Sequence, residues 1–385
     1  MKKLILIIAF LLTINIPIAA NNNGDTNSDL RFASYDFLTD TIIEYQGIDD
    51  EIAIASVSKL MSALLVFEKI NEGSLNLNDS YKYTQEELNL YLYGSDVDIK
   101  LGTEVRVSEL LDLLLVRSAN SSALALAKLV SGSEEAFVKK MNDKAKSLDM
   151  NNTHFINSHG LPIIATDEQN ISTIRDLIKL CKFIFNNYPN IIDYTKKSEV
   201  DLNRLGIRIV TTNPILGRGT IDGLKTGTTN RAGKCLIATA TEPSEGLDMN
   251  RRVFSFVFGA KSDNERRDKS LELINSSLDN YVYKRVIDGN LLYEMALNPI
   301  DYDEESLNII PKTTLDKLLD VRKVYKLKLV YDEFIAHDIE AGERLGELIL
   351  LEDGGEVDKV ELIAQKSIKR SGWFRRLWKK IKSAF

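Results

Sequence analysis

The sequence predicts an α+β protein, in which a cluster of helices packs on an antiparallel sheet and a small all-β domain and an amphipathic helix follow. Three observations lead to this prediction. Apolar residues recur at helical spacing in several segments before Glu199. Strand-like segments then follow one another without intervening helices, which favours antiparallel pairing. Beyond about Val282 alternating and apolar runs return, with turn residues between them and no catalytic motif.

These changes in residue pattern, together with those at the two ends of the chain, divide the sequence into four parts. The first is a signal peptide, the second is the main domain that carries the chemistry, the third is a small β-rich domain, and the fourth is an amphipathic helix for a membrane surface. In order along the chain they are residues 1–20, 21–283, 284–365 and 366–385.

The N-terminus has the pattern of a secretory signal peptide. Met1-Lys2-Lys3 is basic, Leu4 to Leu12 is almost wholly apolar, and Ile18-Ala19-Ala20 is a plausible cleavage end. Ile18 stands where a smaller residue is usual, so an uncleaved anchor helix remains the alternative.

The main domain is organised around a serine and a lysine at the start of a helix. Leu60, Leu64 and Phe67 mark one face of this helix, which begins near Ser56. Lys59 lies three positions after Ser56, so the two side chains share a face. Apolar surroundings desolvate the lysine and favour its neutral form. A neutral amine can take the serine proton and turn the hydroxyl into a nucleophile.

Two further motifs strengthen this weak signal. Ser118-Ala119-Asn120 falls on a short connection between helices predicted at Ser108–Arg117 and Ala123–Val130. Lys225-Thr226-Gly227 lies on a strand predicted from Ile221. The ordered set Ser-x-x-Lys, Ser-x-Asn and Lys-Thr-Gly is far more specific than any one motif, and it is the known signature of penicillin-binding proteins and β-lactamases.

The remaining elements of the main domain follow from periodicity and caps. We expect one or two short strands, two helices, two longer strands and a closing helix. These lie, in order, within Arg31–Tyr45, at Glu134–Leu148, from Ser172-Thr173 to about Asn186, at Lys234–Thr241, at Arg252–Ala260 and at Arg266–Tyr281.

The tail combines aromatic and basic residues at helical spacing. The chain has a net charge of −7, and residues 366–385 hold eight basic and no acidic side chains, which leaves −15 (−7 minus 8) for the rest. Its apolar residues are Trp373, Phe374, Leu377, Trp378, Ile381 and Phe385. This segregation predicts a helix in a membrane interface, with its basic face toward anionic headgroups. A helix docked on a partner or a nucleic-acid tail is the alternative; we expect no nucleic-acid partner because such a tail does not need segregated faces.

Composition and cysteines point to an ordinary globular protein without a metal. Apolar residues make up 44% and charged residues 27% of the chain. Cys181 and Cys235 permit one disulfide, but we favour two buried free thiols, one on a helix and one on a strand. No Cys-x-x-Cys or His/Cys cluster occurs, so neither a metal nor a cofactor is expected.

Over nearly its whole length the chain resembles the low-molecular-mass penicillin-binding proteins that act as D-alanyl-D-alanine carboxypeptidases. The resemblance implies a β-lactamase/transpeptidase-like main domain whose N-terminal strands pair with its C-terminal strands. It rests on Ser56–Met61, Val116–Asn120, Asn157–Leu161, Ser172–Asp176, Asp222–Gly227 and Arg231–Leu236.

By this resemblance Ser56 is the acylated nucleophile and Lys59 its base. Ser118 relays a proton between the lysines and the leaving group. Asn120 binds the substrate amide.

The third motif is expected to hold the substrate. Lys225 and Thr226 bind its terminal carboxylate, for which a cation and a hydroxyl are suitable partners. Gly227 lets the substrate backbone approach the strand edge. The backbone N–H groups of Ser56 and Thr228 receive the oxyanion.

Three further residues match positions near the family's site. Arg266 helps to orient the carboxylate, with its neighbour Arg267 as the alternative. His159 and Asp176 either support Lys225 through a network, or His159 is a structural histidine. Since no Ser-His-Asp triad is marked, lysine is the better base candidate.

These residues predict a serine-type D-Ala-D-Ala carboxypeptidase at the outer face of the bacterial cell membrane. It removes the terminal D-alanine from peptidoglycan stem pentapeptides through an acyl-enzyme, and β-lactams inhibit it.

Two alternatives remain. A class A β-lactamase needs a glutamate and asparagine after Ser-x-Asn, whereas Glu86–Asn89 precedes it and Thr166–Asn170 has the wrong spacing. A non-catalytic wall-binding scaffold is disfavoured because all the motif residues are intact.

Overall fold

The computed structural model describes residues 29–90, 96–244, 247–332 and 335–382, so the expected signal peptide lies outside the described residues. The chain divides into two compact units. One unit holds Asn23–Pro243 and Asn250–Asp279, and the other holds Ser244–Met249 and the chain from Asn280 onward. Each unit has its own hydrophobic core.

The first unit is built on a five-stranded antiparallel sheet with the order β2-β1-β11-β10-β9. Its strands are β1 (Arg31–Asp36), β2 (Thr41–Gln46), β9 (Ile221–Thr229), β10 (Gly233–Pro243) and β11 (Asn250–Ala260). The first strand pairs with the last, from Arg31 opposite Phe258 to Asp36 opposite Val253. The expected pairing of N-terminal with C-terminal strands is therefore confirmed.

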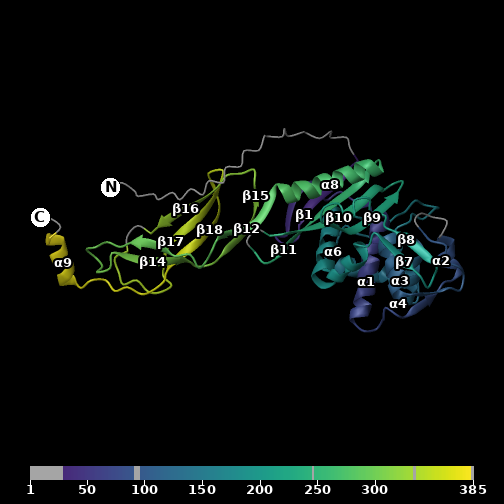
Figure 1. Ribbon diagram of the computed structural model, residues 1–385, viewed down its shortest axis with the longest axis horizontal. Helices are drawn as coiled ribbons and strands as arrows, with labels where there is room; N and C mark the ends of the chain where they lie inside the picture. The colour runs from purple at the N-terminus through teal and green to yellow at the C-terminus, as the bar shows by residue number, and fades with distance from the viewer. Residues whose placement is uncertain (1–28, 91–95, 245–246, 333–334, 383–385) are drawn as a thin grey trace. The chain divides into compact units, whose positions relative to one another are not determined.

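Helices cover both faces of this sheet. Helix α8 (Asp263–Asp279) lies along one face, as Figure 1 shows, and the other helices of this unit lie on the opposite face. The strand residues alternate accordingly. Leu236 and Ala238 of β10 pack in the small core with Ile274 of α8, whereas Cys235 and Ile237 join the main core. The prediction of an α+β fold with helices packed on an antiparallel sheet is confirmed.

The other elements of this unit are short strands, α-helices, and three short 3₁₀- or π-helical segments, which are labelled η. The short strands are β3 (Ile52–Ala53), β4 (Ser80–Lys82), β5 (Glu104–Arg106), β6 (Ile171–Ser172), β7 (Glu199–Leu202) and β8 (Ile207–Val210). The helical segments are η1 (Ala55–Ser58), α1 (Lys59–Asn71), α2 (Gln85–Leu90), α3 (Val107–Asp112), η2 (Leu113–Arg117), α4 (Asn120–Ser131), α5 (Glu134–Ser147), α6 (Ile174–Asn187), η3 (Pro189–Ile191) and α7 (Ile192–Thr195).

Two helices begin earlier than their sequence pattern predicted. Helix α4 begins at Asn120 instead of Ala123, because the carboxylate of the distant Asp96 accepts the first N–H groups of the helix. Helix α8 begins at Asp263 instead of Arg266. Here Ser262 and Glu265 form a reciprocal cap, in which each side chain accepts a backbone N–H near the other residue.

The second unit consists of β-sheets and a terminal helix. A five-stranded antiparallel sheet has the order β13-β14-β18-β17-β16, and β12 pairs with β15. The elements are β12 (Tyr281–Ile287), β13 (Tyr293–Ala296), β14 (Ser306–Pro311), β15 (Leu315–Asp320), β16 (Tyr325–Tyr331), β17 (Arg344–Glu352), β18 (Gly355–Ala364) and α9 (Trp373–Lys382). The predicted all-β domain and terminal helix are thus present.

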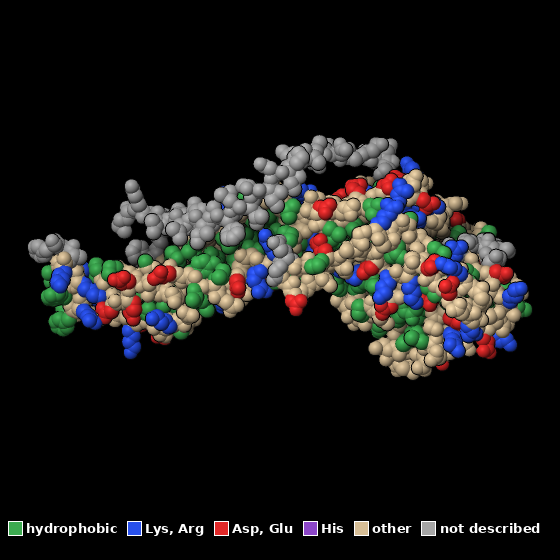
Figure 2. All heavy atoms as spheres, viewed as in Figure 1, with side chains coloured by type: hydrophobic (Ala, Val, Ile, Leu, Met, Phe, Trp, Pro, Cys, Tyr) green, Lys and Arg blue, Asp and Glu red, His purple; other side chains and the backbone are tan. Residues whose placement is uncertain are grey.

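Helix α9 exposes a row of large apolar side chains. They are Trp373, Phe374, Leu377, Trp378 and Ile381, between 44% and 80% exposed. Figure 2 shows hydrophobic and basic side chains gathered at this helix. Its basic residues meet two aspartates of the same unit: Arg375 and Lys379 pair with Asp303, at 2.5 and 2.8 Å, and Arg376 lies 3.7 Å from Asp301. Among the described residues, no helix is long and apolar enough to cross a bilayer.

Both cysteines are buried free thiols, on α6 and β10, as the sequence indicated. Burial raises the pKa of the Cys235 thiol to about 12. The two residues therefore act as small apolar side chains of the core.

Candidate active site

Ser56 and Lys59 lie on consecutive turns at the start of the central helix. Ser56 belongs to the 3₁₀ turn η1, and Lys59 is the first residue of α1. In a 3₁₀ turn, residues three apart lie nearly above one another. The Lys59 Nζ is accordingly 2.8 Å from the Ser56 Oγ. Ala55, just before the serine, has a positive φ of 46°, a rare conformation for a non-glycine residue that is typical of functional sites.

The Lys59 amine is fully buried and has three polar neighbours. Besides Ser56 Oγ, its Nζ donates to Asn120 Oδ1 and to the backbone oxygen of His159, both at 2.7 Å. Burial lowers the pKa of Lys59 to about 7, although the negative charge of Asp96 opposes this shift. The amine is therefore partly neutral at neutral pH.

A second buried lysine reaches the same place from the sheet. Lys225 on β9 donates from Nζ to Ser118 Oγ at 2.7 Å and to the Thr226 backbone oxygen at 2.9 Å. Ser118 ends the π-helical turn η2 with a left-handed backbone, at a φ of 67°. Burial holds the pKa of Lys225 well below its usual value, and the positive charges of Lys59 and Arg266 add to the effect.

Strand β9 is an edge strand of the sheet, and it packs against the serine turn. A Cβ added at Gly227 would lie 3.1 Å from the Ile54 oxygen and 3.2 Å from the Ser56 nitrogen. Glycine thus permits a close approach between β9 and η1. The neighbouring Thr226 Oγ1 lies 2.6 Å from Thr212 Oγ1, and Thr228 is exposed and donates to the Gly227 oxygen.

Arg266 and Arg267 are distinguished by burial. The Arg266 side chain is 8% exposed and lies 2.8 Å from Asp263, whereas Arg267 is 34% exposed and pairs with Asp268. The Arg266 Nη1 reaches toward the backbone oxygen of Cys235 at 3.4 Å, while its buried Nε has no hydrogen-bond partner among the described residues. Arg266 is therefore the inward residue of the pair.

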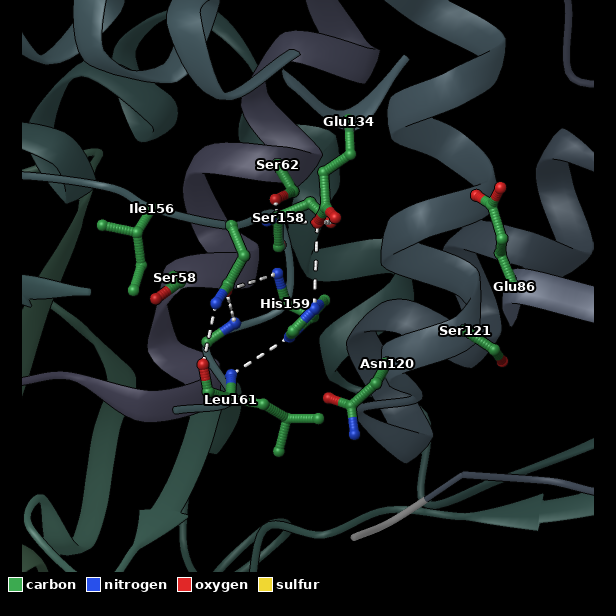
Figure 3. A network of polar contacts seen from close by, with 12 residues as sticks. Ser58, Ser62, Glu86, Asn120, Ser121, Glu134, Ile156, Ser158, His159 and Leu161 are labelled. Atoms are coloured by element: carbon green, nitrogen blue, oxygen red, sulfur yellow. Dashed lines mark hydrogen bonds and ion pairs between the residues drawn. The ribbon is translucent and has the colours of Figure 1, made fainter. Parts of the chain in front are cut away.

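His159 contacts the site through its backbone, and its ring is held elsewhere. Figure 3 shows the ring between Glu134 and Leu161. Its Nδ1 accepts the Leu161 N–H at 3.1 Å, and its Nε2 is 3.8 Å from the Glu134 Oε1. Burial and the charge of Lys59 lower the pKa of His159 to about 3, so the ring is neutral.

Asp176 bonds instead to Asn152 and Thr153 and pairs with Lys179. No polar contact of His159 or Asp176 with Lys225 occurs among the described residues. Of the two interpretations left open by the sequence, this arrangement favours a structural histidine.

Several supporting residues were not identified from the sequence. Asn170 is fully buried; its Nδ2 donates to Ser58 Oγ at 2.8 Å, and its Oδ1 accepts the Ile156 N–H at 2.7 Å. Ser62 donates to the Ser158 oxygen at 2.6 Å. A polar residue one turn after Lys59 on a buried helix face was the available signal for Ser62. Asp96 and Asn170 lie in irregular segments, where no periodicity marks a buried position.

The described residues include no cluster of three or more His, Cys, Asp and Glu side chains that could hold a metal ion. The groups that converge are two lysines, two serines and an asparagine. They can perform proton transfer and nucleophilic attack, with Arg266 as a nearby buried cation.

The family model for D-alanyl-D-alanine carboxypeptidases matches residues 31–262. The chain is 29% identical over 398 residues to D-alanyl-D-alanine carboxypeptidase DacF of Bacillus subtilis, covering 97% of this chain and 96% of that protein. The structure of DacD from Francisella tularensis has a TM-score of 0.70 at 22% identity, covering 94% and 98%. Penicillin-binding protein D2 of Listeria monocytogenes in its ampicillin-bound form has a TM-score of 0.55 at 30% identity, covering 64% and 95%.

Proposed function

The chain belongs to the D-alanyl-D-alanine carboxypeptidase family, and from this premise we propose how its residues perform that reaction. The enzyme is a serine-type carboxypeptidase. Ser56 attacks the carbonyl of the terminal D-Ala-D-Ala bond, D-alanine leaves, and water hydrolyses the acyl-enzyme. The observation that carries the proposal is the hydrogen bond between Ser56 Oγ and the fully buried Lys59 Nζ.

The three contacts of Lys59 suit a neutral base. Asn120 Oδ1 and the His159 oxygen can only accept, so they take the two N–H groups of a neutral amine. The third neighbour is Ser56 Oγ, which can donate its proton to the lone pair of the nitrogen. The arrangement therefore directs the lone pair of the neutral amine at the nucleophile.

Lys225 and Ser118 are suited to carry the proton onward. Their 2.7 Å contact gives Ser118 Oγ a donor on one side, and the hydroxyl can pass its own proton to the leaving amine. Burial lowers the pKa of Lys225, so its amine gives up a proton more readily than an ordinary lysine.

The substrate carboxylate and the oxyanion are assigned to the side of the site near β9. Thr226, Lys225 and the Arg266 guanidinium are the donors proposed for the carboxylate. The backbone N–H groups of Ser56 and Thr228 would stabilise the oxyanion, a proposal supported by the close packing of Gly227 on Ser56. As an edge strand, β9 can also pair with an extended peptide.

We infer that the substrate is the peptidoglycan stem pentapeptide and that β-lactams acylate Ser56. The ampicillin-bound structure of the Listeria relative supports β-lactam binding. The enzyme then works outside the cytoplasmic membrane, where this substrate is found. The family match does not favour a class A β-lactamase or a non-catalytic scaffold.

The test is labelling of the purified protein with a fluorescent penicillin, followed by release of D-alanine from a pentapeptide. We expect a stable covalent band that Ser56→Ala abolishes. Ser74→Ala, a change at an exposed serine, is the matched control and should label normally. Rapid turnover of penicillin would indicate a β-lactamase. A folded protein that forms no covalent band would leave only the interpretation as a non-catalytic wall-binding scaffold.

We also propose that α9 places the protein on a membrane surface. The exposed aromatic row is the supporting observation, since such residues prefer the bilayer interface. Vesicles of mixed neutral and anionic lipid should sediment the wild-type protein, and Phe374→Ser with Trp378→Ser should reduce binding about tenfold or more. Leu291→Ser with Leu292→Ser changes two other exposed apolar residues outside α9 and should leave binding unchanged. Equal binding by all three proteins would refute this role of α9.

A further inference from the structure

Asp96 is a buried carboxylate that touches the active-site machinery and has no role in the mechanism described so far. Its Oδ2 accepts the backbone N–H groups of Asn120 and Ser121 at 3.0 and 2.8 Å. Its Oδ1 accepts the Ser121 hydroxyl at 2.5 Å. The side chain therefore caps α4 from a segment that is distant in the sequence, and three donors suit an ionised carboxylate.

A single residue, Asn120, connects this cap to Lys59, the proposed base. Asn120, whose N–H binds Asp96, is also the residue whose Oδ1 accepts from Lys59 at 2.7 Å. Fixing the backbone of Asn120 therefore fixes the acceptor that orients the amine. Asn120 is the first residue of α4, so Asp96 holds the helix at the residue that follows the Ser118-Ala119 connection.

The other charged and titratable groups near Lys59 come from several elements. Lys225 on β9 is a second buried amine, and His159 in its loop is neutral. Glu134 of α5 accepts from the Ser158 N–H and hydroxyl. Around Asp96, Tyr83 lies 3.3 Å from Ser121 Oγ and is neutral because burial raises its pKa.

Two further groups lie one step away. Glu87 is paired with Lys128, and Arg266 of α8 acts on Lys225. Among the described residues, Asp96 is thus the acidic group whose charge acts on Lys59, where it raises the pKa against the larger effect of burial.

We propose that Asp96 is a positioning residue of the acylation step: it anchors Asn120 against Lys59, and its negative charge favours the protonated form of the Lys59 amine. The inference rests on the proposed function of Lys59. It leads to an uncommon expectation: removal of the negative charge should increase the rate of acylation at acidic pH. A neutral residue at this position no longer stabilises the protonated amine.

The experiment measures the rate constant for acylation by penicillin between pH 5 and 9. The wild-type rate should rise tenfold per pH unit in acid and level off near pH 7, as a property of the coupled lysines. Asp96→Asn keeps the shape of the side chain and can still accept both N–H groups. In this variant the rising part of the pH profile, its acidic limb, should move to lower pH by about half a unit. The acylation rate at a given acidic pH should then be about threefold higher than in the wild type. Asp98→Asn removes an exposed charge two residues away and should leave the profile unchanged.

Other outcomes would count against the inference. A limb that stays in place, or moves to higher pH, would overturn it, because a purely structural cap changes the plateau alone. Asp96→Ser is the second neutral variant in case Asp96→Asn does not fold, since it also removes the charge and keeps a small polar side chain. If neither folds, Asp96 is only structural and the inference is wrong. A wild-type protein that is not acylated at Ser56 would overturn the proposed function as well, whereas acylation with an unmoved limb overturns this inference alone.

Discussion

The buried site in the first unit and the helix α9 in the second both bring lysines near oxygen atoms, but with opposite consequences. Lys59 is wholly buried and meets neutral oxygens, and its pKa falls to about 7. Lys379 of α9 is partly exposed and pairs with the Asp303 carboxylate at 2.8 Å. Burial without a paired carboxylate lowers the pKa of Lys59, whereas Lys379 has a carboxylate partner at the surface. A lysine side chain is thus the proposed base in one region and an ion-pair partner in the other.

The largest effect should come from removing the buried amine. Lys59→Met keeps an unbranched side chain of similar length but replaces the basic amine by a thioether, which is far too weak a base to take the Ser56 proton. We expect acylation by penicillin to fall by about 10³-fold or more, within the usual range for a general base. The melting temperature checks the fold. Lys69→Met, at a part-exposed lysine on the same helix, should acylate normally; loss of less than tenfold in Lys59→Met would contradict its role as base.

Two glycines with nearly the same backbone sharpen the comparison of the regions. Gly160 has a φ of 88°, and a Cβ there would lie 2.0 Å from the Ala55 oxygen, whereas Gly354 in the second unit has a φ of 90° and open space. Gly160→Ala should cost about 3 kcal/mol of unfolding free energy from backbone strain and steric overlap. Gly354→Ala should cost about 1 kcal/mol from backbone strain alone. Denaturant titration measures the unfolding free energy of both variants. Equal losses would show that the loop around Gly160 moves to make room for the added methyl group.

The smallest effect should come from the surface pairs of α9. Asp303→Asn frees Arg375 and Lys379 for anionic lipid, so binding to anionic vesicles should rise about fivefold. The melting temperature should barely change, since exposed ion pairs contribute little to stability. Asp332→Asn, which breaks a pair with Arg344 in the same unit, is the matched control. Weaker vesicle binding by Asp303→Asn would mean that the pairs orient α9 for the membrane.

Much of the fold and the central residues of the candidate site could be predicted from the sequence. The Ser-x-x-Lys spacing placed two side chains on one face because helical geometry fixes that relation locally. The alternation of β10 and β11 likewise determined which residues face the helices. These are short-range relations that periodicity reports directly.

The residues that were missed depend on long-range packing. Asp96 and Asn170 bind backbone groups of distant segments, so neither has a local pattern. The same applies to the start of α4, whose cap comes from Asp96 and not from the preceding residues. By contrast, the cap of α8 by Ser262 and Glu265 was visible as a Ser-x-x-Glu motif and could have placed that helix correctly.

The pairing of β1 with β11 has a consequence for how the chain folds. The strand that begins at Arg31 pairs locally with β2, but it finds its second partner only when the strand that ends at Ala260 exists, so the sheet closes between the two ends of the domain. Such non-local pairing delays folding, because a long loop must close before any contact compensates for it. A chain stopped before Asn250 would have Ser56, Lys59 and Lys225 but would lack the strand between β1 and β10. Ser56 is therefore synthesised early, and the proposed active site around it is complete only once nearly the whole domain has been made.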